Sequence, residues 1–320
     1  MSAAAPSKVW LLHMAVIGLL AVLQFVLPDY HHGVLAKVMV LAVFAIGYNL
    51  LFGYTGLLSL GHAMFFAAGL YGTGLAMQHL GWSAPFALFA GIAAGALLAL
   101  VIGLLALRTT GVAFMIVTMM FAQVLYLTIL YFSRWTMGDQ GFVLPQGVRA
   151  VDLAGMRLDL TDPTTRYWCA LSLFAVALFA SLAVVRSRYG RVLIAIRENE
   201  ERTRMLGYDT FSSKLLAVVA SGTISAAAGA SYALLFGYVG ASFASIQYSI
   251  LPLLWVLLGG AATTLGPLAG TLFMQYAVDI ASGFTSAWLL LVGLALILLV
   301  LFFPRGMLGT LRERWLGWLP

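Results

Sequence analysis

The densest charge in the sequence lies in residues 197–209, RENEERTRMLGYD, within a chain that is otherwise strongly apolar. Two acid–base pairs in this stretch, Glu198 with Arg202 and Glu200 with Arg204, are spaced i, i+4 with the acid first. That order is the favourable one for ion pairs on a helix surface. The spacing therefore predicts a short, charged surface helix.

The predicted helix covers about residues 192–206. It is expected to end at Gly207, because glycine readily adopts the left-handed conformation of a helix C-cap. Asp209 or Thr210 is expected to cap the helix that follows. The apolar residues of the short helix are too few to hold it in lipid. Its charges alone fit either a solvated loop or a surface that docks a soluble partner.

Few polar side chains that could do chemistry occur in the long apolar stretches. They are Asn49, Ser59, His62, Gln123, Gln275 and Asp279. These stretches contain no paired acids, no metal-ligand spacing and no Ser–His–Asp arrangement, so neither an enzyme nor a metal site is predicted. They also lack the ionisable residues of a proton relay. The energy for any transport is therefore expected to come from another protein, with an ion-coupled secondary transporter and a channel as the alternatives.

Three single residues have simple interpretations. His62 is expected to form a hydrogen bond to a neighbouring carbonyl, as the alternative to lining a path. Asp279, near the end of an apolar segment, is expected at the outer surface. The one cysteine, Cys169, excludes a disulfide within the chain and is interpreted as an apolar filler.

The composition indicates the surroundings of these residues. Of 320 residues, 62% are hydrophobic and 9% are charged, and the mean hydropathy is +1.01, whereas a soluble domain carries roughly 25% charged residues. In lipid the backbone must form helices or a closed barrel, and long runs without strict alternation favour helices. The predicted fold is an all-α, polytopic transmembrane bundle with about eight to ten spans. It forms a single membrane domain over residues 1–320.

The spans are expected between clusters of turn-forming residues. The first span is interpreted as retained rather than as a signal peptide. The expected positions are about 9–27, 34–52, 63–79, 84–106, 111–132, 167–185, 215–236 and 286–303, with shorter apolar segments at about 249–260 and 267–282.

Two glycine-rich stretches interrupt the apolar segments. One is GYTGLLSLGH, residues 53–62, and the other is GGAATTLGPLAG, residues 259–270. Paired broken segments in the two halves of a chain are typical of inverted-repeat transporters. The alternative is that these glycines only let helices pack closely. If residues 249–282 form a re-entrant hairpin, the number of full spans is eight or nine rather than ten.

Basic residues predict the orientation, because Lys and Arg accumulate in cytoplasmic loops. With ten spans, Lys8, Arg108, the segment 186–214 and the C-terminal tail all fall on one side, which is assigned as cytoplasmic. The loop 133–166 then faces outward. The net charge of +6 arises beside apolar spans, which argues against nucleic-acid binding. The segment 186–214 contains Arg186, Arg188, Arg191, Arg197, Arg202, Arg204 and Lys214, and the tail contains Arg305, Arg312 and Arg314.

Four motifs carry a resemblance to a known family. They are GYNLLFGYTGLLSLGHAMFFAAGLYGTG, RYGRVLIAIRENEERTRMLGYDTFSSKLLAVVAS, LLGGAATTLGPLAGTLF and FPRGMLG, in this order. Over about residues 35–310 the chain resembles the branched-chain amino acid permeases of the LivM type. The stretch 197–209 resembles the cytoplasmic coupling loop of ABC importer permeases, in which a Glu precedes a Gly by a few residues. Glu200 and Glu201 stand seven and six positions before Gly207, whereas Arg202 and Thr203 depart from the small residues of the family.

The resemblance implies a permease subunit of an ATP-driven importer in the bacterial inner membrane, with both termini cytoplasmic. It implies a second related permease, two ATP-binding subunits and a periplasmic binding protein that delivers leucine, isoleucine, valine or a related compound. Urea or short amides are the alternative substrates. The chain itself lacks a P-loop, because none of its lysines, Lys8, Lys37 and Lys214, follows a glycine. No bound cofactor is therefore expected, and ATP is used by the partners.

Two groups of site residues follow from this resemblance. Residues of the coupling loop are expected to dock the ATPase, and polar residues at the first break are expected to meet the substrate. The coupling residues are Arg197, Glu198, Asn199, Glu200, Glu201 and Gly207, and the pathway residues are Asn49, Thr55, Ser59 and His62.

Overall fold

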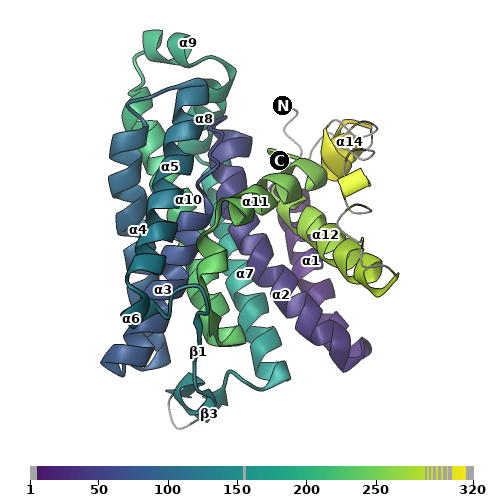
Figure 1. Ribbon diagram of the computed structural model, residues 1–320. Helices are drawn as coiled ribbons and strands as arrows, with labels where there is room; N and C mark the ends of the chain where they lie inside the picture. The colour runs from purple at the N-terminus through teal and green to yellow at the C-terminus, as the bar shows by residue number, and fades with distance from the viewer. Residues whose placement is uncertain are drawn as a thin grey trace.

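The computed structural model of the protein describes residues 6–153, 156–284 and 305–314, together with 287, 290, 293, 294, 297 and 301. This part of the chain is a bundle of helices (Figure 1), and its strands form only two short antiparallel pairs. The predicted fold class, a polytopic helical membrane bundle, is confirmed. The predicted span at 286–303 lies almost entirely outside the described residues.

Six helices of the described part are long and apolar enough to cross a membrane, by length and composition. Three further helices match the predicted segments at 63–79, 249–260 and 267–282 but are shorter or less apolar. The six are α1 (Pro6–Val26), α2 (Asp29–Asn49, extended by a π-helix over Leu50–Tyr54), α4 (Ala84–Ala106), α5 (Gly111–Tyr131), α7 (Pro163–Arg186) and α10 (Thr210–Phe236); the others are α3 (Ala63–Leu80), α11 (Ile246–Gly259) and α12 (Gly266–Phe284).

Helix α2 lies at the centre of the bundle. Its residues from Val38 to Asn49 are all buried, and Phe44 and Tyr48 are among the largest fully buried side chains. Helices α3 and α10 approach each other so closely at Gly69 that an added Cβ would clash with the carbonyl of Ala226. Small residues permit such contacts between membrane helices. The core is therefore built on a central helix and on glycine-mediated packing around it.

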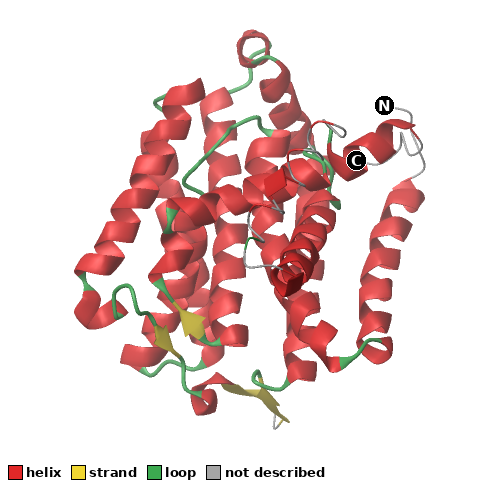
Figure 2. Cartoon of the chain, turned by 45° about the vertical axis from the view of Figure 1, so that its right-hand side comes forward, coloured by secondary structure: helices red, strands yellow, loops and turns green. Residues whose placement is uncertain are grey.

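The two ends of the bundle carry different structures (Figures 1 and 2). One end holds the short strands and small helices of the predicted outer loop, and the other end holds the charged block, which forms α8 (Arg188–Glu198) and α9 (Glu200–Met205). The first end contains α6 (Ser133–Thr136), β1 (Phe142–Val143), η2 (Gln146–Arg149) and β2 (Ala150–Leu153) paired with β3 (Met156–Asp159). β1 pairs with β4 (Tyr238–Val239), which follows α10 and lies outside the predicted loop; η3 (Ala241–Ala244) comes next in the chain. The last described helix is α14 (Gly306–Arg314).

Candidate functional site

The charged block forms two helices, and the prediction of one helix over 192–206 is wrong. Asn199 has an extended backbone, with φ −162° and ψ 105°, and it separates α8 from α9. Its side-chain oxygen accepts a hydrogen bond from the backbone N–H of Arg202, 2.9 Å away. Asparagine favours this N-cap geometry over a place inside a helix. The expected pair of Glu198 with Arg202 is therefore divided between two helices.

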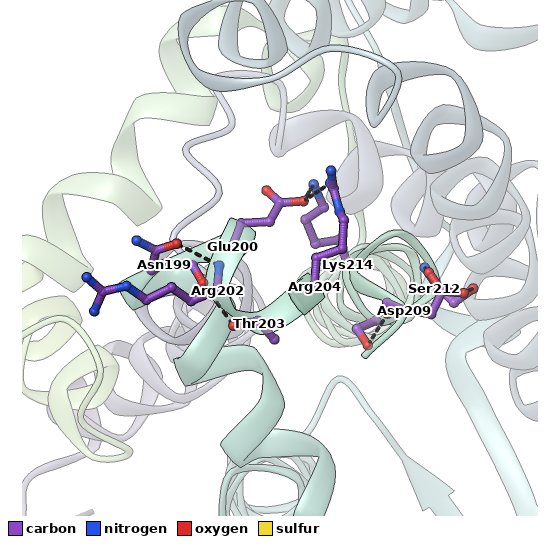
Figure 3. Close-up of polar contacts among 9 residues, drawn as sticks. Asn199, Glu200, Arg202, Thr203, Arg204, Asp209, Ser212 and Lys214 are labelled. Carbon is purple, nitrogen blue, oxygen red and sulfur yellow. Dashed lines mark hydrogen bonds and ion pairs between the residues drawn. The ribbon is translucent and has the colours of Figure 1, made fainter. Parts of the chain in front are cut away.

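The second expected pair is present, and it is extended by a lysine. Glu200 lies 3.4 Å from the guanidinium of Arg204 and only 2.6 Å from the ammonium of Lys214, at the start of α10 (Figure 3). Burial raises the pKa of the Glu200 carboxyl, but hydrogen bonds from Lys214 and Thr210 and the charges of Lys214 and Arg204 outweigh that effect, so the pKa lies below its ordinary value. The ionised Glu200 joins α9 to α10.

Gly207 ends α9 as predicted. Its φ is +88°, a conformation that glycine adopts without strain. The N–H of Gly207 donates to the carbonyl of Arg204 at 2.9 Å, and the N–H of Tyr208 donates to the carbonyl of Thr203 at 3.4 Å. These are the two bonds of a Schellman motif. Of the two expected caps for α10, Asp209 is the one used, because its carboxylate accepts from the backbone N–H of Ser212 at 3.1 Å.

The tip of the block exposes apolar side chains that the sequence analysis did not single out. Met205 is 79% exposed, Leu206 is 76% exposed and Tyr208 is 51% exposed. The expected docking residues Glu198, Asn199 and Glu201 are also exposed. The sequence signal for this surface was the pair of apolar residues, Met205 and Leu206, directly before the C-cap Gly207. α9 projects beyond the long helices at this end of the bundle (Figure 1). Met205, Leu206 and Tyr208 lie at or just after the end of α9, and these three exposed side chains are called the apolar patch.

Arg197 is also exposed, but its guanidinium reaches toward the bundle. Its Nη1 donates a hydrogen bond to the carbonyl of Gly53, in the π-helical end of α2. Its aliphatic stem lies over Gly56, where an added Cβ would be 2.9 Å from Cγ of Arg197. The structure thus places Arg197 against the first broken segment.

The two broken segments meet at Asn49. Its amide nitrogen donates to the carbonyl of Thr263 at 2.9 Å, and its amide oxygen accepts from the N–H of Ala262 at 3.0 Å. Asn49 is 1% exposed, so its amide group is shielded from solvent. Two stretches more than 200 positions apart in sequence are therefore joined by one buried side chain.

The other expected pathway residues form bonds within the protein. Thr55 donates to the carbonyl of Leu50 at 3.0 Å, and Ser59 accepts from the N–H of Gly61 at 3.3 Å. Both are almost fully buried. In this conformation the polar groups of the first break are enclosed by their own segment.

His62 is fully buried against α10. Its Nε2 lies 2.8 Å from the hydroxyl of Ser225 and 3.3 Å from that of Ser221, so hydroxyl groups take the place of the expected carbonyl. Ser221 in turn donates to the carbonyl of Gly47 in α2 at 2.6 Å. These two serines were missed because the sequence gives no sign of which residues of span 215–236 face residue 62.

The second broken segment is held by two residues that were not predicted to belong to the site, although Arg312 was counted among the basic residues of the tail. Arg312 of α14 donates to the carbonyl of Ala262 at 3.2 Å, and Nε2 of His13 in α1 lies 2.7 Å from the hydroxyl of Thr264. Ala262 has a φ of +57° in the turn between α11 and α12. The turn is thus fixed from three helices, α1, α2 and α14.

The structure also shows the surroundings of Asp279 and Cys169. Asp279, near the end of α12, accepts a hydrogen bond from the hydroxyl of Tyr30 at 2.5 Å in an exposed position. Cys169 lines a cavity of about 390 Å³ between α4, α7 and α10, together with Leu173, Ser231 and Leu234. The lining is mostly apolar, in agreement with the interpretation of Cys169 as an apolar filler.

Comparisons with known proteins identify the family. Residues 31–301 match the model of the branched-chain amino acid transport system permease component. The chain is 27% identical to the high-affinity branched-chain amino acid transport system permease protein LivM of Escherichia coli K12, over 86% of this chain and 69% of the relative. It is 26% identical to LivM of Salmonella typhimurium LT2 over the same shares, and 29% identical to a probable LivM of Methanocaldococcus jannaschii over 44% of this chain and 45% of the relative. No solved structure matches the chain. The chain belongs to the family of branched-chain amino acid transport permeases.

Proposed function

We propose that the protein is a permease subunit of an ATP-driven importer for leucine, isoleucine and valine. The observation that carries this proposal is the family match over residues 31–301. The relatives named above are likewise described as permease proteins of branched-chain amino acid transport systems. The helical bundle and its polar contact between two broken segments support it. The protein itself forms part of the translocation pathway, and the energy for transport comes from partner subunits that hydrolyse ATP.

The α8–α9 unit is proposed as the docking element for an ATP-binding subunit. Three features support this role. The unit projects from one end of the bundle, it carries an apolar patch of Met205, Leu206 and Tyr208, and it is braced on α10 by the bond between Glu200 and Lys214. Exposed apolar groups surrounded by charge are typical of a protein contact.

The partners and the location follow the same proposal. A second related permease completes the path, two ATP-binding subunits lie beneath the pair, and a periplasmic binding protein delivers the substrate. The end with α8 and α9 is then cytoplasmic, because basic residues gather there, and both chain termini lie on that side. Such a complex belongs in the inner membrane of a bacterium.

The substrate path is proposed to pass the contact between the two broken segments. Asn49, Thr55, Ser59 and His62 are buried there and engaged in bonds within the protein. Their polar groups become available to the ends of an amino acid only when the two segments separate. The described conformation is therefore proposed to be closed at this point.

The function is tested by reconstituting the permease with its partner subunits in proteoliposomes and following leucine uptake. Uptake is expected to require ATP and to survive an uncoupler. Uptake that continues without ATP but collapses with the uncoupler would identify a secondary transporter instead. Competition by valine but not by urea is expected, and the reverse would assign the alternative substrates.

The docking role has a separate test. Met205→Glu with Leu206→Glu places charge in the apolar patch, and co-purification of the ATP-binding subunit is expected to fall at least tenfold. Val143→Glu is the matched control, because Val143 is also exposed, at 66%, but lies in β1 at the other end of the bundle. Unchanged co-purification in the double variant would remove this role from α9.

A further inference from the structure

Arg197 links the charged block to the inside of the bundle. It lies one residue before the end of α8, and its guanidinium donates to the carbonyl of Gly53 in the first broken segment. Arg204 and Lys214, by contrast, both bind Glu200 within the block. The bond of Arg197 therefore leaves the proposed docking element and reaches a backbone group of the proposed path.

The fit between Arg197 and the first break is close at a second point. Gly56 has a φ of +77°, and a Cβ added there would lie 2.9 Å from Cγ of Arg197 and 3.4 Å from its Cβ. The arginine stem thus rests on the backbone of the turn, while its head binds the carbonyl three residues earlier. The two contacts hold the start and the end of the turn 53–56 against α8.

The turn that Arg197 holds is joined to the second broken segment. Asn49 binds Ala262 and Thr263, and Arg312 binds the carbonyl of Ala262 from the side of α14. A displacement of Arg197 would therefore act on both breaks at once, through Asn49.

We infer that Arg197 is the positioning residue through which movement of the α8–α9 unit reaches the broken segments. The inference rests on the proposed ATP-driven import. α8 is suited to such a role, because it is a continuous helix capped by Ser187, whose hydroxyl accepts from the N–H of Gly190 at 3.2 Å. Arg197, predicted to be a docking residue, thus serves in transmission instead.

The experiment compares Arg197→Ala and Arg197→Lys with Arg191→Ala in the reconstituted complex. Arg191 is the matched control, because it carries the same charge on the same helix and is exposed. In Arg197→Ala the ATP-binding subunits are expected to stay bound and to hydrolyse ATP, while the ATP consumed per leucine imported rises at least tenfold. Arg197→Lys is expected to recover part of the coupling, because lysine can also donate to the Gly53 carbonyl. Arg191→Ala is expected to match the wild type.

A second readout follows the broken segment directly. Leu58 is half-buried in the first break, and Leu58→Cys in a Cys169→Ser background provides a single site for a maleimide. Its labelling rate is expected to change with ATP in the wild type and to lose that change in Arg197→Ala. Gly56→Ala places a Cβ against the stem of Arg197 and is expected to give the same uncoupling. It replaces Arg197→Ala in the experiment if that variant does not insert into the membrane.

The outcomes separate the inference from the proposed function. Wild-type ATP consumption per leucine in Arg197→Ala, or in Gly56→Ala where the first variant does not insert, would overturn the inference. Loss of the ATP-binding subunits from Arg197→Ala would return the residue to the docking surface and overturn it as well. Absence of ATP-dependent leucine uptake in the wild-type complex would overturn the proposed function before any variant is compared.

Discussion

Glu200 accepts hydrogen bonds from two cations, and only one of them could be predicted. Arg204 is four positions away, so helix geometry alone brings it near. Lys214 is 14 positions away, beyond the Gly207 turn, and makes the shorter bond of 2.6 Å. The contact between Glu200 and Lys214 was not predictable, because the direction in which the chain leaves the Gly207 turn depends on how α10 packs in the bundle. Local spacing predicted the more exposed pair, Glu200 with Arg204, whereas the more buried pair, Glu200 with Lys214, depends on tertiary structure.

Glu200→Gln is expected to destabilise the folded protein by roughly 1–3 kcal/mol, because Lys214 is 5% exposed and loses its charged partner. The folded pKa of Glu200 lies below its ordinary value of 4.5, so its stabilisation is fully present above about pH 4.5 and is lost as the pH falls through the folded value. Thermal unfolding of the purified protein at several pH values is the measurement.

The control for this prediction is Glu201→Gln, which changes an exposed neighbour of the same charge. It is expected to leave the unfolding temperature near that of the wild type at every pH. The wild type and Glu200→Gln are expected to converge in the acid range. Parallel curves with no convergence would contradict the assignment of the stabilisation to an ionised Glu200.

Asn49→Asp is expected to separate the two broken segments. Aspartate keeps an acceptor for the N–H of Ala262 but loses the donor to the carbonyl of Thr263, and its charge would face that oxygen. Leaving a buried polar group without its partner costs about 1–3 kcal/mol. Lower thermal stability and faster maleimide labelling of Leu58→Cys are the expected results.

A matched comparison for Asn49 is Ser59→Ala, at the same break. Ser59 accepts a local bond from Gly61 and does not reach the second segment in the described structure. Its replacement is expected to change labelling of Leu58→Cys little. Equal effects of the two variants would mean that the contact between the breaks is not what holds the first one closed.

At the scale of elements, the sequence predicted where the chain breaks but not how the breaks meet. Glycine clusters located both interruptions, because glycine permits the positive φ found at Gly56 and Gly260. Their contact through Asn49 joins residues more than 200 positions apart, and periodicity carries no information at that range. The division of the charged block was missed for another reason, since the i, i+4 pairs outweighed the N-cap preference of Asn199.

Gly207→Ala is expected to destabilise the end of α9 by about 1 kcal/mol, because a φ of +88° is strained for a residue with a Cβ. No atom lies within 4 Å of the added Cβ, so the effect isolates backbone strain from steric clash. Slower binding of the ATP-binding subunit and a lower unfolding temperature are the measurements.

Two further variants bracket the Gly207 effect. Gly207→Asn is expected to be milder, because asparagine tolerates the left-handed conformation better than alanine. Gly18→Ala, in helix α1 with open space around it, is expected to be neutral or slightly stabilising, because alanine is favoured over glycine within a helix. A Gly207→Ala protein as stable as Gly18→Ala would contradict the role of Gly207 as a helix terminator.

At the scale of the whole molecule, the two loops that the sequence assigned to opposite sides lie at opposite ends of the bundle (Figure 1). This arrangement was predictable, because the sequence placed a single span, 167–185, between the two loops, and α7 is that span. The hydrogen bonds that fix the second break from α1 and α14, through His13 and Arg312, were not. Polar residues at the ends of apolar segments have many possible partners, and only the packed bundle selects among them.

The orientation of the bundle leads to a prediction for intact cells. Gln146, in η2 directly before β2, and Glu201, in α9, are both exposed. The β2–β3 pair and α9 lie at opposite ends of the bundle (Figure 1). With Cys169 replaced by serine, a membrane-impermeant maleimide added outside is expected to label Gln146→Cys and to spare Glu201→Cys, because the seven basic residues of the segment 186–214 favour the cytoplasmic side. Permeabilised cells, in which both sites should react, control for accessibility. Labelling of Glu201→Cys alone in intact cells would invert the orientation, and it would also place α9 out of reach of any cytoplasmic ATP-binding subunit.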